Sequence, residues 1–209
     1  MRLFDFERAP NPRRVRIFLA EKGLEIPRIP VDLYRMEQLS DAFLAINPAG
    51  TVPVLETDDG SYLTESVAIC HYLESQHPEP RLMGQGALEQ AQVLMWNNVS
   101  EQDGLPAVAE TLRNLSPGFR DHVFPGPQPY AQMPELVERG QARMQQFFDR
   151  IETQLASHGW LAGGDYSLAD ISLLVTVDFA RWVRYDATRG RPALARWYGQ
   201  ARARPSSDA

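Results

Sequence analysis

The segment from Asn47 to Ser66 decides the fold of the first part of the chain, and its sequence is NPAGTVPVLETDDGSYLTES. The run at residues 52–56 predicts a strand, and Asp58-Asp59-Gly60 predicts a tight hairpin turn into a second strand at residues 61–63. Glu65 then begins a helix whose apolar positions share one face: Val67, Ile69, Cys70 and Leu73. We therefore predict a strand–turn–strand–helix unit.

Short strands and helices alternate before this unit. Residues 3–6 and 26–32 predict two strands, the second at a sheet edge because it holds two prolines. Asn11-Pro12 predicts the start of the helix between them, with Asn11 as its N-cap. Residues 36–45 predict a further short helix. The order strand–helix–strand–helix–strand–strand–helix predicts an α/β domain with a mixed sheet.

The chain after His77-Pro78-Glu79-Pro80 is predicted to be helical. Helically spaced apolar residues mark residues 88–102, interrupted near Gly104 and Pro106, and residues 136–155. A last helix is expected over residues 192–202.

The segment Ser167-Leu168-Ala169-Asp170 has the spacing of a capping box. The helix after it is apolar on nearly every side and should form the centre of the helical half. The proline-rich residues 115–134 predict a surface loop. We predict a first domain at residues 1–78, a linker at 79–86 and an all-helical domain at 87–209.

Composition restricts the function classes. The 209 residues carry a net charge of −6, which argues against a nucleic-acid partner. Cys70 is the single cysteine, so a disulfide framework is impossible within the chain and no Cys-x-x-Cys chemistry is available. The four histidines show no metal-ligand spacing. With no signal peptide or membrane-length apolar run, we expect a cytoplasmic protein without membrane attachment.

Short motifs follow one another along the whole chain in a characteristic order. They are Pro10–Arg16, Glu21-Lys22-Gly23, Asn47–Leu55, Leu63–Ile69 with Tyr72-Leu73, Ser167–Ile171 and Arg204-Pro205-Ser206. In this order they resemble the glutathione transferase superfamily, in its bacterial cytosolic form. The resemblance implies a thioredoxin-like, glutathione-binding first domain, an all-helical second domain, a homodimer and a role in detoxification.

The resemblance places glutathione on two segments of the first domain. Val52, between Thr51 and Pro53, presents its backbone N–H and C=O to the cysteinyl part of glutathione, as in strand addition to a sheet edge. Ser66 binds the γ-glutamyl carboxylate and Glu65 pairs with the ammonium. Physical reasoning supports this placement, because a helix N-terminus favours a carboxylate ligand.

Two further binding residues follow from the resemblance. Gln38 matches the residue that holds the glycyl carboxylate, and Asp103 matches an acidic residue that reaches the ammonium across the dimer. For each of them, a solvated helix residue without a ligand remains the alternative.

The catalytic residue departs from the common pattern of Tyr, Ser or Cys. Where a catalytic Ser would fall, the chain has Ala9, which donates no hydrogen bond. Asn11 matches bacterial members with a Thr-Pro-Asn-like motif, in which the Asn lies near the sulfur. We therefore assign the thiol donor to Asn11, assisted by the helix N-terminus. Alternatives are that Asn11 only caps its helix, and that a backbone amide or the arginines at 13 and 14 activate the thiol.

These residues imply an enzyme that activates the glutathione thiol for attack on a small hydrophobic electrophile, a peroxide or a disulfide. Glutathione would be the co-substrate, with no metal. The electrophile pocket would involve Phe6, Ala9, Pro10, Arg113 and Phe119. Two other functions stay open: a glutathione-binding or interaction module with little activity, and a glutathione-dependent isomerase or dehalogenase.

Overall fold

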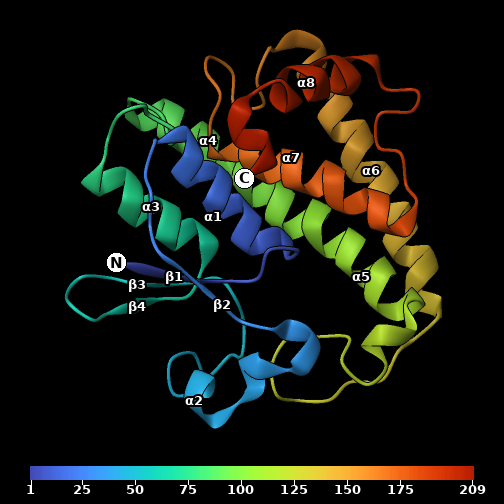
Figure 1. The fold of residues 1–209 in the computed structure, drawn as a ribbon. Helices are drawn as coiled ribbons and strands as arrows, with labels where there is room; N and C mark the ends of the chain where they lie inside the picture. The colour runs from blue at the N-terminus through green and yellow to red at the C-terminus, as the bar shows by residue number, and fades with distance from the viewer. The chain divides into compact units, whose positions relative to one another are not determined.

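The computed structural model describes residues 1–209, which form two compact units. The sheet unit comprises residues 1–80, 124–129 and 209, and the helical unit comprises residues 81–123 and 130–208. The predicted domain limits at residues 78 and 86 stay a prediction. Figure 1 shows the elements of both units.

The sheet unit is built on four strands: β1 (Arg2–Asp5), β2 (Arg28–Pro30), β3 (Val54–Glu56) and β4 (Tyr62–Leu63). Their order is β2-β1-β3-β4, with β1 parallel to β2 and antiparallel to β3. The mixed sheet and the edge position of β2 are thus as predicted. Helices α1 (Pro10–Glu21) and α3 (Ser66–Gln76) pack against each other on one side of the sheet (Figure 1).

The helix predicted over residues 36–45 is shorter in the structure, where a 3-10 helix at Glu37–Leu39 is followed by the α-helix α2 (Asp41–Leu44). A further 3-10 helix, Leu33–Arg35, precedes the predicted range. Met36, left-handed with φ of 58°, separates the two 3-10 helices, and Ser40, extended with ψ of 150°, separates Glu37–Leu39 from α2. Ser40 then caps α2, its Oγ accepting a hydrogen bond from the Phe43 N–H at 3.3 Å.

The helical unit holds α4 (Ala87–Val99), α5 (Leu105–Leu115), α6 (Glu135–Ser157), α7 (Leu168–Ala180) and α8 (Pro192–Arg202). Shorter 3-10 turns lie at Pro117–Phe119, Arg181–Val183 and Pro205–Asp208. The break predicted near residue 104 is a π-helical turn, Ser100–Gly104, that joins α4 to α5. Pro106, which has no N–H to donate, lies in the first turn of α5, directly after this π-helical turn, in which the Leu105 N–H donates to the Ser100 oxygen.

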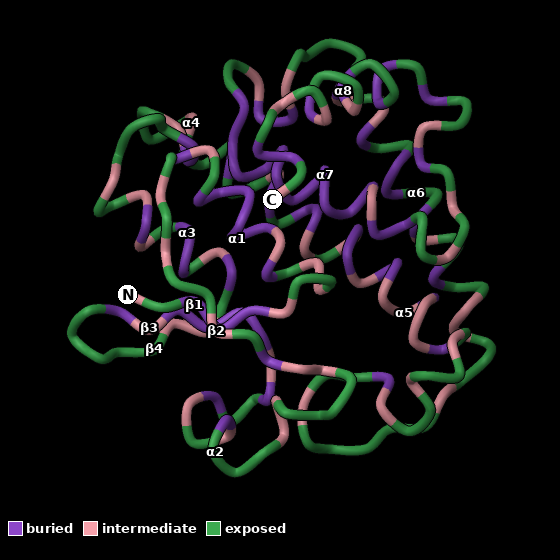
Figure 2. Tube along the Cα trace, viewed as in Figure 1, coloured by how far each residue is buried: buried purple, intermediate pink, exposed green.

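Helix α7 forms the core of the helical unit and packs on α4, α5 and α8. All of its residues except Asp178 are buried, as the continuous buried colour along it shows (Figure 2). Asp170 joins the start of α7 to its surroundings. Its carboxylate accepts hydrogen bonds from Leu161 N (2.9 Å), Ser167 N (3.1 Å) and Trp197 Nε1 (2.8 Å). This confirms the predicted capping role of Asp170.

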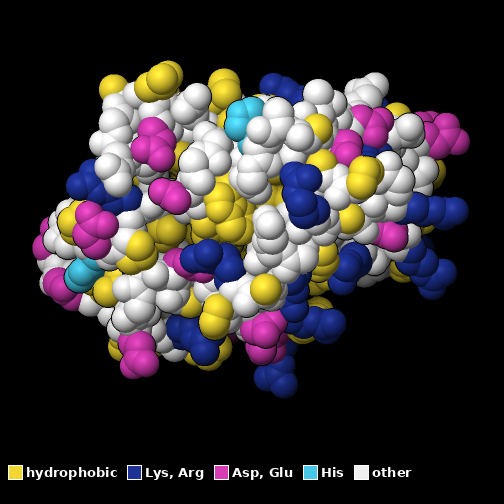
Figure 3. Space-filling model, turned by 90° about the horizontal axis from the view of Figure 1, so that it is seen from above, with side chains coloured by type: hydrophobic (Ala, Val, Ile, Leu, Met, Phe, Trp, Pro, Cys, Tyr) yellow, Lys and Arg dark blue, Asp and Glu magenta, His cyan; other side chains and the backbone are white.

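No helix is long and apolar enough to cross a membrane. Basic and acidic side chains both occur over the face of the molecule drawn in Figure 3.

Candidate functional site

The turn before β3 is organised by the buried side chain of Asn47. Its Nδ2 donates to the backbone oxygen of Thr51 at 2.9 Å and to the Thr51 hydroxyl at 3.0 Å. Its Oδ1 accepts from the Ala49 N–H at 3.1 Å. One amide side chain therefore holds both ends of the turn, and the peptide bond that follows, Val52–Pro53, is cis.

The backbone of Val52 lies just beyond the end of the sheet ladder. Pairing between β1 and β3 extends from Arg2 opposite Glu56 to Phe4 opposite Val54. No hydrogen bond of the neighbouring turn uses the Val52 N–H or C=O. Both groups can therefore pair with an extended peptide-like ligand, in the way that a strand is added to an edge.

Gln38 is brought next to this turn by a close backbone approach. A Cβ placed on Gly50, whose φ is +60°, would lie 2.7 Å from Leu39 Cδ2 and 3.2 Å from the Gln38 backbone oxygen. The Gln38 side chain has a buried Oε1 without a hydrogen-bond partner, while its Nε2 contacts only the Met36 sulfur, at 3.7 Å. This amide is weakly used by the protein, which suits a residue that binds a ligand.

Glu65 and Ser66 occupy the N-terminus of α3. Glu65 is the N-cap, but its exposed side chain makes no capping hydrogen bond. Ser66 is buried, and its Oγ donates to the backbone oxygen of Asn11 at 3.3 Å. The simple capping interpretation therefore does not account for the Glu65 carboxylate, and Ser66 joins the starts of α1 and α3.

Asn11 is not the N-cap of α1, so that expectation is wrong. The helix begins at Pro10, and Ala9 occupies the cap position without a side-chain bond. The reason is that both prolines fit within the first turn, where their missing N–H groups cost nothing. Asn11 is exposed, and its Oδ1 accepts from Arg14 Nη1 at 3.4 Å.

The bond to Arg14 fixes the orientation of the Asn11 amide. A guanidinium only donates, so the atom that faces it must be Oδ1, and Nδ2 points the other way. The Nδ2 donor of Asn11 is therefore not used to cap its own helix. Arg14 itself is 2% exposed, so it is not part of a solvated helix face as the alternative interpretation held.

A buried ion pair fixes the loop between β1 and α1. Arg16 Nη1 lies 2.6 Å from Asp5 Oδ1, and Arg16 Nη2 donates to the Glu7 backbone oxygen at 2.7 Å. Burial lowers the pKa of Arg16, and the charge of Asp5 opposes this shift. Arg16 thus ties the end of β1 to the loop that leads to Ala9.

Phe6 and Ala9 pack against one apolar cluster that contains Val52 and Val54. This cluster places the end of β1 beside the cis peptide segment. The Phe6 ring also meets Tyr34 edge-on at 5.3 Å, and the Tyr34 hydroxyl accepts from Arg8 Nη1 at 3.0 Å. Tyr34 is 71% exposed and was missed by sequence reasoning, because its pairing with Phe6 arises only when the turn at residues 33–35 folds back.

The remaining predicted residues belong to the helical unit. Asp103 lies on the π-helical turn, with its Oδ2 3.2 Å from Arg150 Nη1. Arg113 stacks over Phe119 at 5.7 Å and donates to the Val123 backbone oxygen at 3.2 Å. Burial lowers the pKa of Arg113. The structure therefore brings Arg113 and Phe119 together, while Asp103 pairs within its own unit.

No group of three or more His, Cys, Asp or Glu residues in the chain is arranged to hold a metal ion.

Comparison with known proteins decides the family. Residues 3–81 match the glutathione S-transferase N-terminal domain, and residues 134–200 match the glutathione S-transferase C-terminal domain. The chain belongs to the glutathione S-transferase family. Its sheet unit is accordingly thioredoxin-like and is followed by the all-helical C-terminal domain, as predicted, and members of this family use glutathione as co-substrate.

Relatives of this glutathione S-transferase family member cover nearly its full length. Glutathione S-transferase 2 of Saccharomyces cerevisiae is 32% identical over 99% of this chain and 87% of its own. The maleylacetoacetate isomerase of Pseudomonas aeruginosa is also 32% identical, over 94% of this chain and 86% of its own. A solved glutathione S-transferase domain-containing protein from Marinobacter aquaeolei superposes with a TM-score of 0.92 at 32% identity, covering 99% of this chain and 100% of its own.

Proposed function

We propose that the chain binds glutathione on the sheet unit and activates its thiol for attack on a hydrophobic electrophile. The observation that carries the proposal is the junction of α1 and α3: Ser66 bonds to the backbone of Asn11, beside an unused carboxylate on Glu65. The N–H groups in the first turn of α3 have no helical partner and would bind the γ-glutamyl carboxylate. Glu65 then faces the ammonium of the same γ-glutamyl group.

The cysteinyl and glycyl parts of glutathione would bind along the same surface. The Val52 N–H and C=O would pair with the cysteinyl residue, with Thr51 and Pro53 on either side of them. Gln38, next to the Gly50 turn, would bind the glycyl carboxylate through its amide nitrogen. Glutathione would thus lie extended, with its thiol near the start of α1.

Asn11 is proposed as the thiol donor. A free thiol with a pKa near 8.5 is only a few per cent thiolate at neutral pH. A hydrogen bond to a charged acceptor is worth about 1.5–3 kcal/mol, which lowers a pKa by roughly one to two units. The Asn11 Nδ2, oriented by Arg14, supplies such a donor, and the positive end of α1 adds to it.

The reaction that we propose is a substitution at carbon. The thiolate sulfur forms a bond to an electrophilic carbon, the leaving group departs with its bonding electrons, and the thiol proton has already passed to solvent. Within the sheet unit, Phe6, Ala9 and Pro10 would line the electrophile side. A peroxide or a disulfide is the other electrophile class open to the same thiolate.

A homodimer is proposed for the working enzyme, with Asp103 contributing to the site of its neighbour. Helix α4 supports this proposal because Leu94 and Met95 are 44% and 51% exposed on it. Light scattering after size-exclusion chromatography tests it.

A glutathione-dependent isomerase is the second candidate, because a relative of this chain is named maleylacetoacetate isomerase. An isomerase would add the thiolate to a double bond and release glutathione again, so glutathione would not be consumed. Following the glutathione concentration during turnover of a haloarene, a hydroperoxide, a disulfide and a cis-enone separates the two candidates.

The test of the proposed site has two stages. Calorimetric titration must show glutathione binding in the millimolar range or tighter. The ultraviolet absorbance of the thiolate in the complex, followed against pH, must then show a pKa below that of free glutathione. Absent binding refutes the site, and binding with an unshifted pKa supports a glutathione-binding module instead of an enzyme.

A further inference from the structure

A proline-rich strap, residues 124–129 with the sequence FPGPQP, belongs to the sheet unit, although the residues on both sides of it belong to the helical unit. Figure 1 shows this part of the loop between α5 and α6 near α2. The loop predicted over residues 115–134 therefore has one segment that packs on the sheet unit, and no role has yet been assigned to that segment.

Two glycines make the contact between the strap and the sheet unit. Gly126 has φ of +105°, and a Cβ placed on it would lie 3.1 Å from the Ala49 backbone oxygen. A Cβ placed on Gly50 would lie 3.6 Å from the Gly126 Cα and 2.7 Å from Leu39 Cδ2. Because both glycines have positive φ and little room for a side chain, they allow the two backbones to approach this closely. The strap therefore lies directly against the turn at residues 47–51.

This contact lies at the Gln38 end of the proposed glutathione site. The Gln38 backbone oxygen would lie 3.2 Å from the same Cβ on Gly50 that is 3.6 Å from the Gly126 Cα. Gln38 and Gly126 thus approach Gly50 from two segments that are distant in the chain. Since Gln38 is proposed to bind the glycyl carboxylate, the strap lies where the glycyl part of glutathione would end.

The strap also brings unused hydrogen-bond donors to this place. Three of its six residues are prolines, which have a fixed φ and no N–H, so the segment is stiff. No hydrogen bond of the structure uses the N–H of Gly126 or Gln128. A carboxylate only accepts hydrogen bonds, and bonds from backbone N–H groups to a charged acceptor are among the stronger ones. The strap is therefore suited to bind a carboxylate.

We propose that residues 126–128 close the glutathione site at its glycyl end and donate a backbone N–H to the glycyl carboxylate, beside Gln38. This inference rests on the glutathione site proposed above and adds a binding segment to it. The strap makes the C-terminal glycine a condition of tight binding. The ligand selected is thus a thiol tripeptide with a free C-terminal carboxylate, in preference to a shorter γ-glutamyl thiol.

Two ligands that differ in the glycine test the proposal on the full-length protein. They are glutathione and amidated γ-glutamylcysteine, which ends in a neutral amide where glutathione continues into glycine. We expect calorimetric titration of the wild type to show at least about tenfold tighter binding of glutathione, the effect of one hydrogen bond to a charged acceptor. Equal affinities would overturn the role of the strap alone, whereas binding of neither ligand would refute the glutathione site itself.

Gly126→Ala should displace the strap, because the new Cβ must move away from the Ala49 oxygen. We expect glutathione binding to weaken about tenfold. Binding of amidated γ-glutamylcysteine should stay unchanged, since the Asn47 side chain holds the turn at residues 47–51 without the strap.

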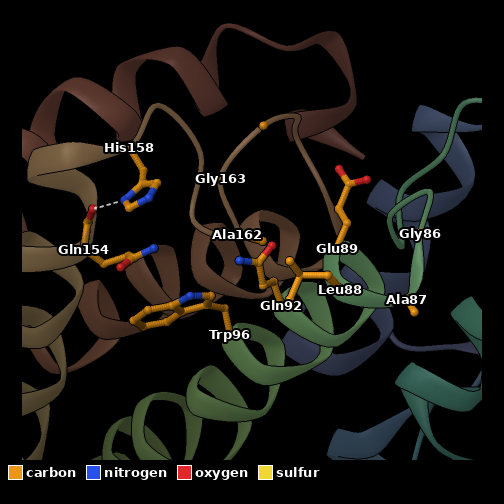
Figure 4. Close-up of a pocket in the computed structure, with 11 residues that line it drawn as sticks. Gly86, Ala87, Leu88, Glu89, Gln92, Trp96, Gln154, His158, Ala162 and Gly163 are labelled. Atoms are coloured by element: carbon orange, nitrogen blue, oxygen red, sulfur yellow. Dashed lines mark hydrogen bonds between the residues drawn. The ribbon is translucent and has the colours of Figure 1, made fainter.

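Gly163→Ala is the matched control. Gly163 has a similar φ of +114°, but nothing lies within 4 Å of an added Cβ. It lines an open hollow between α4 and the end of α6 in the helical unit (Figure 4). This substitution therefore introduces the same backbone strain away from the strap, and it should change the affinity of neither ligand.

A second variant loosens the strap without adding a clash. Replacing Pro125 and Pro127 together by Ala removes two fixed φ angles, so the strap must be ordered when the ligand binds. Glutathione binding should weaken about threefold, and amidated γ-glutamylcysteine should again be unaffected. Thermal unfolding of each variant shows whether it is folded. If glutathione affinity stays at the wild-type value in both strap variants, or if both ligands weaken equally, the strap does not bind the glycine and the proposal is wrong.

Discussion

The Ser66 hydroxyl donates to the backbone oxygen of Asn11 at 3.3 Å, and this bond joins the first turns of α3 and α1. The two helix starts are 55 residues apart in the chain, yet they bring together the residues proposed to hold glutathione and to activate its thiol. The positive ends of both helix dipoles therefore lie close together. The end of α3 would favour the γ-glutamyl carboxylate of the proposed ligand, and the end of α1 would favour its thiolate. We therefore expect glutathione binding and thiol activation to depend on the same pair of helix starts.

Removing the Asn11 donor should raise the thiol pKa of bound glutathione. Asn11→Ala is expected to raise it by about one to two units, the value of one charge-assisted hydrogen bond. Asn11→Asp keeps the oxygen that Arg14 binds but loses the donor and adds a negative charge, so the pKa should rise further. Thiolate absorbance against pH measures both. Asn98→Ala, at an exposed position on α4, is the control. If the thiol pKa is unchanged in both Asn11 variants, a backbone N–H and not Asn11 activates the thiol.

Glu65→Gln should separate ligand binding from helix capping. Because the Glu65 side chain makes no capping bond, the midpoint of thermal unfolding should stay the same. Glutathione affinity should fall about tenfold through loss of a charge-assisted bond to the ammonium. A glutathione analogue without the amino group should bind the wild type and the variant alike. If the variant instead unfolds at lower temperature with unchanged affinity, Glu65 acts only on the helix.

Gly50→Ala should disturb the turn at residues 47–51, which lies in the proposed glutathione site. The new Cβ would meet Leu39 Cδ2 at 2.7 Å in a left-handed conformation, so we expect a loss of about 2–4 kcal/mol in the free energy of unfolding. Glutathione affinity should fall as well, because the Gln38 segment must move. Gly60→Ala is the matched control: its φ is +83° but nothing lies within 4 Å, so only the conformational cost of about 1–2 kcal/mol applies. Equal losses in both variants would show that the contact with Leu39 is not tight.

Asp170 should make stability depend on pH. Burial raises the pKa of Asp170 to about 6, although four hydrogen-bond donors oppose the shift. The folded state therefore holds a proton that the unfolded state has lost, and this contribution disappears as pH rises from about 4 to 6. It amounts to about 3 kcal/mol at most. Asp170→Asn should be less stable than wild type at every pH, because Trp197, Leu161 and Ser167 compete for one oxygen.

Urea unfolding of wild type and Asp170→Asn across this range measures the effect. The stability difference between them should shrink as pH rises from 4 to 6, since only the wild type loses the proton. A difference that grows over the same range would mean that the four donors outweigh burial and lower the pKa.

Local sequence patterns were sufficient to predict the type of most helices, strands and turns. The Asp58-Asp59-Gly60 turn and the apolar run of α7 depend on neighbouring residues only, and both match the structure. The start of α1 was predicted two residues late, because two proline positions in one turn offer two equally good helix starts. The helix expected at residues 36–45 is reduced to α2, because Met36 takes a left-handed conformation and Ser40 an extended one, and no residue preference predicts the first.

The sequence by itself determined the family and the order of the elements, and its motifs supplied the residues that we propose for glutathione binding. It did so because motif spacing and hydrophobic periodicity are local properties of the chain. Only the tertiary structure decided how those residues are placed and which contacts they make. It buried Arg14 so that the Asn11 amide is oriented, set Tyr34 against Phe6, and joined Ser66 to Asn11. These contacts link segments distant in the chain, or depend on burial, and a hydrogen bond has meaning only when the position and solvent exposure of both partners are known.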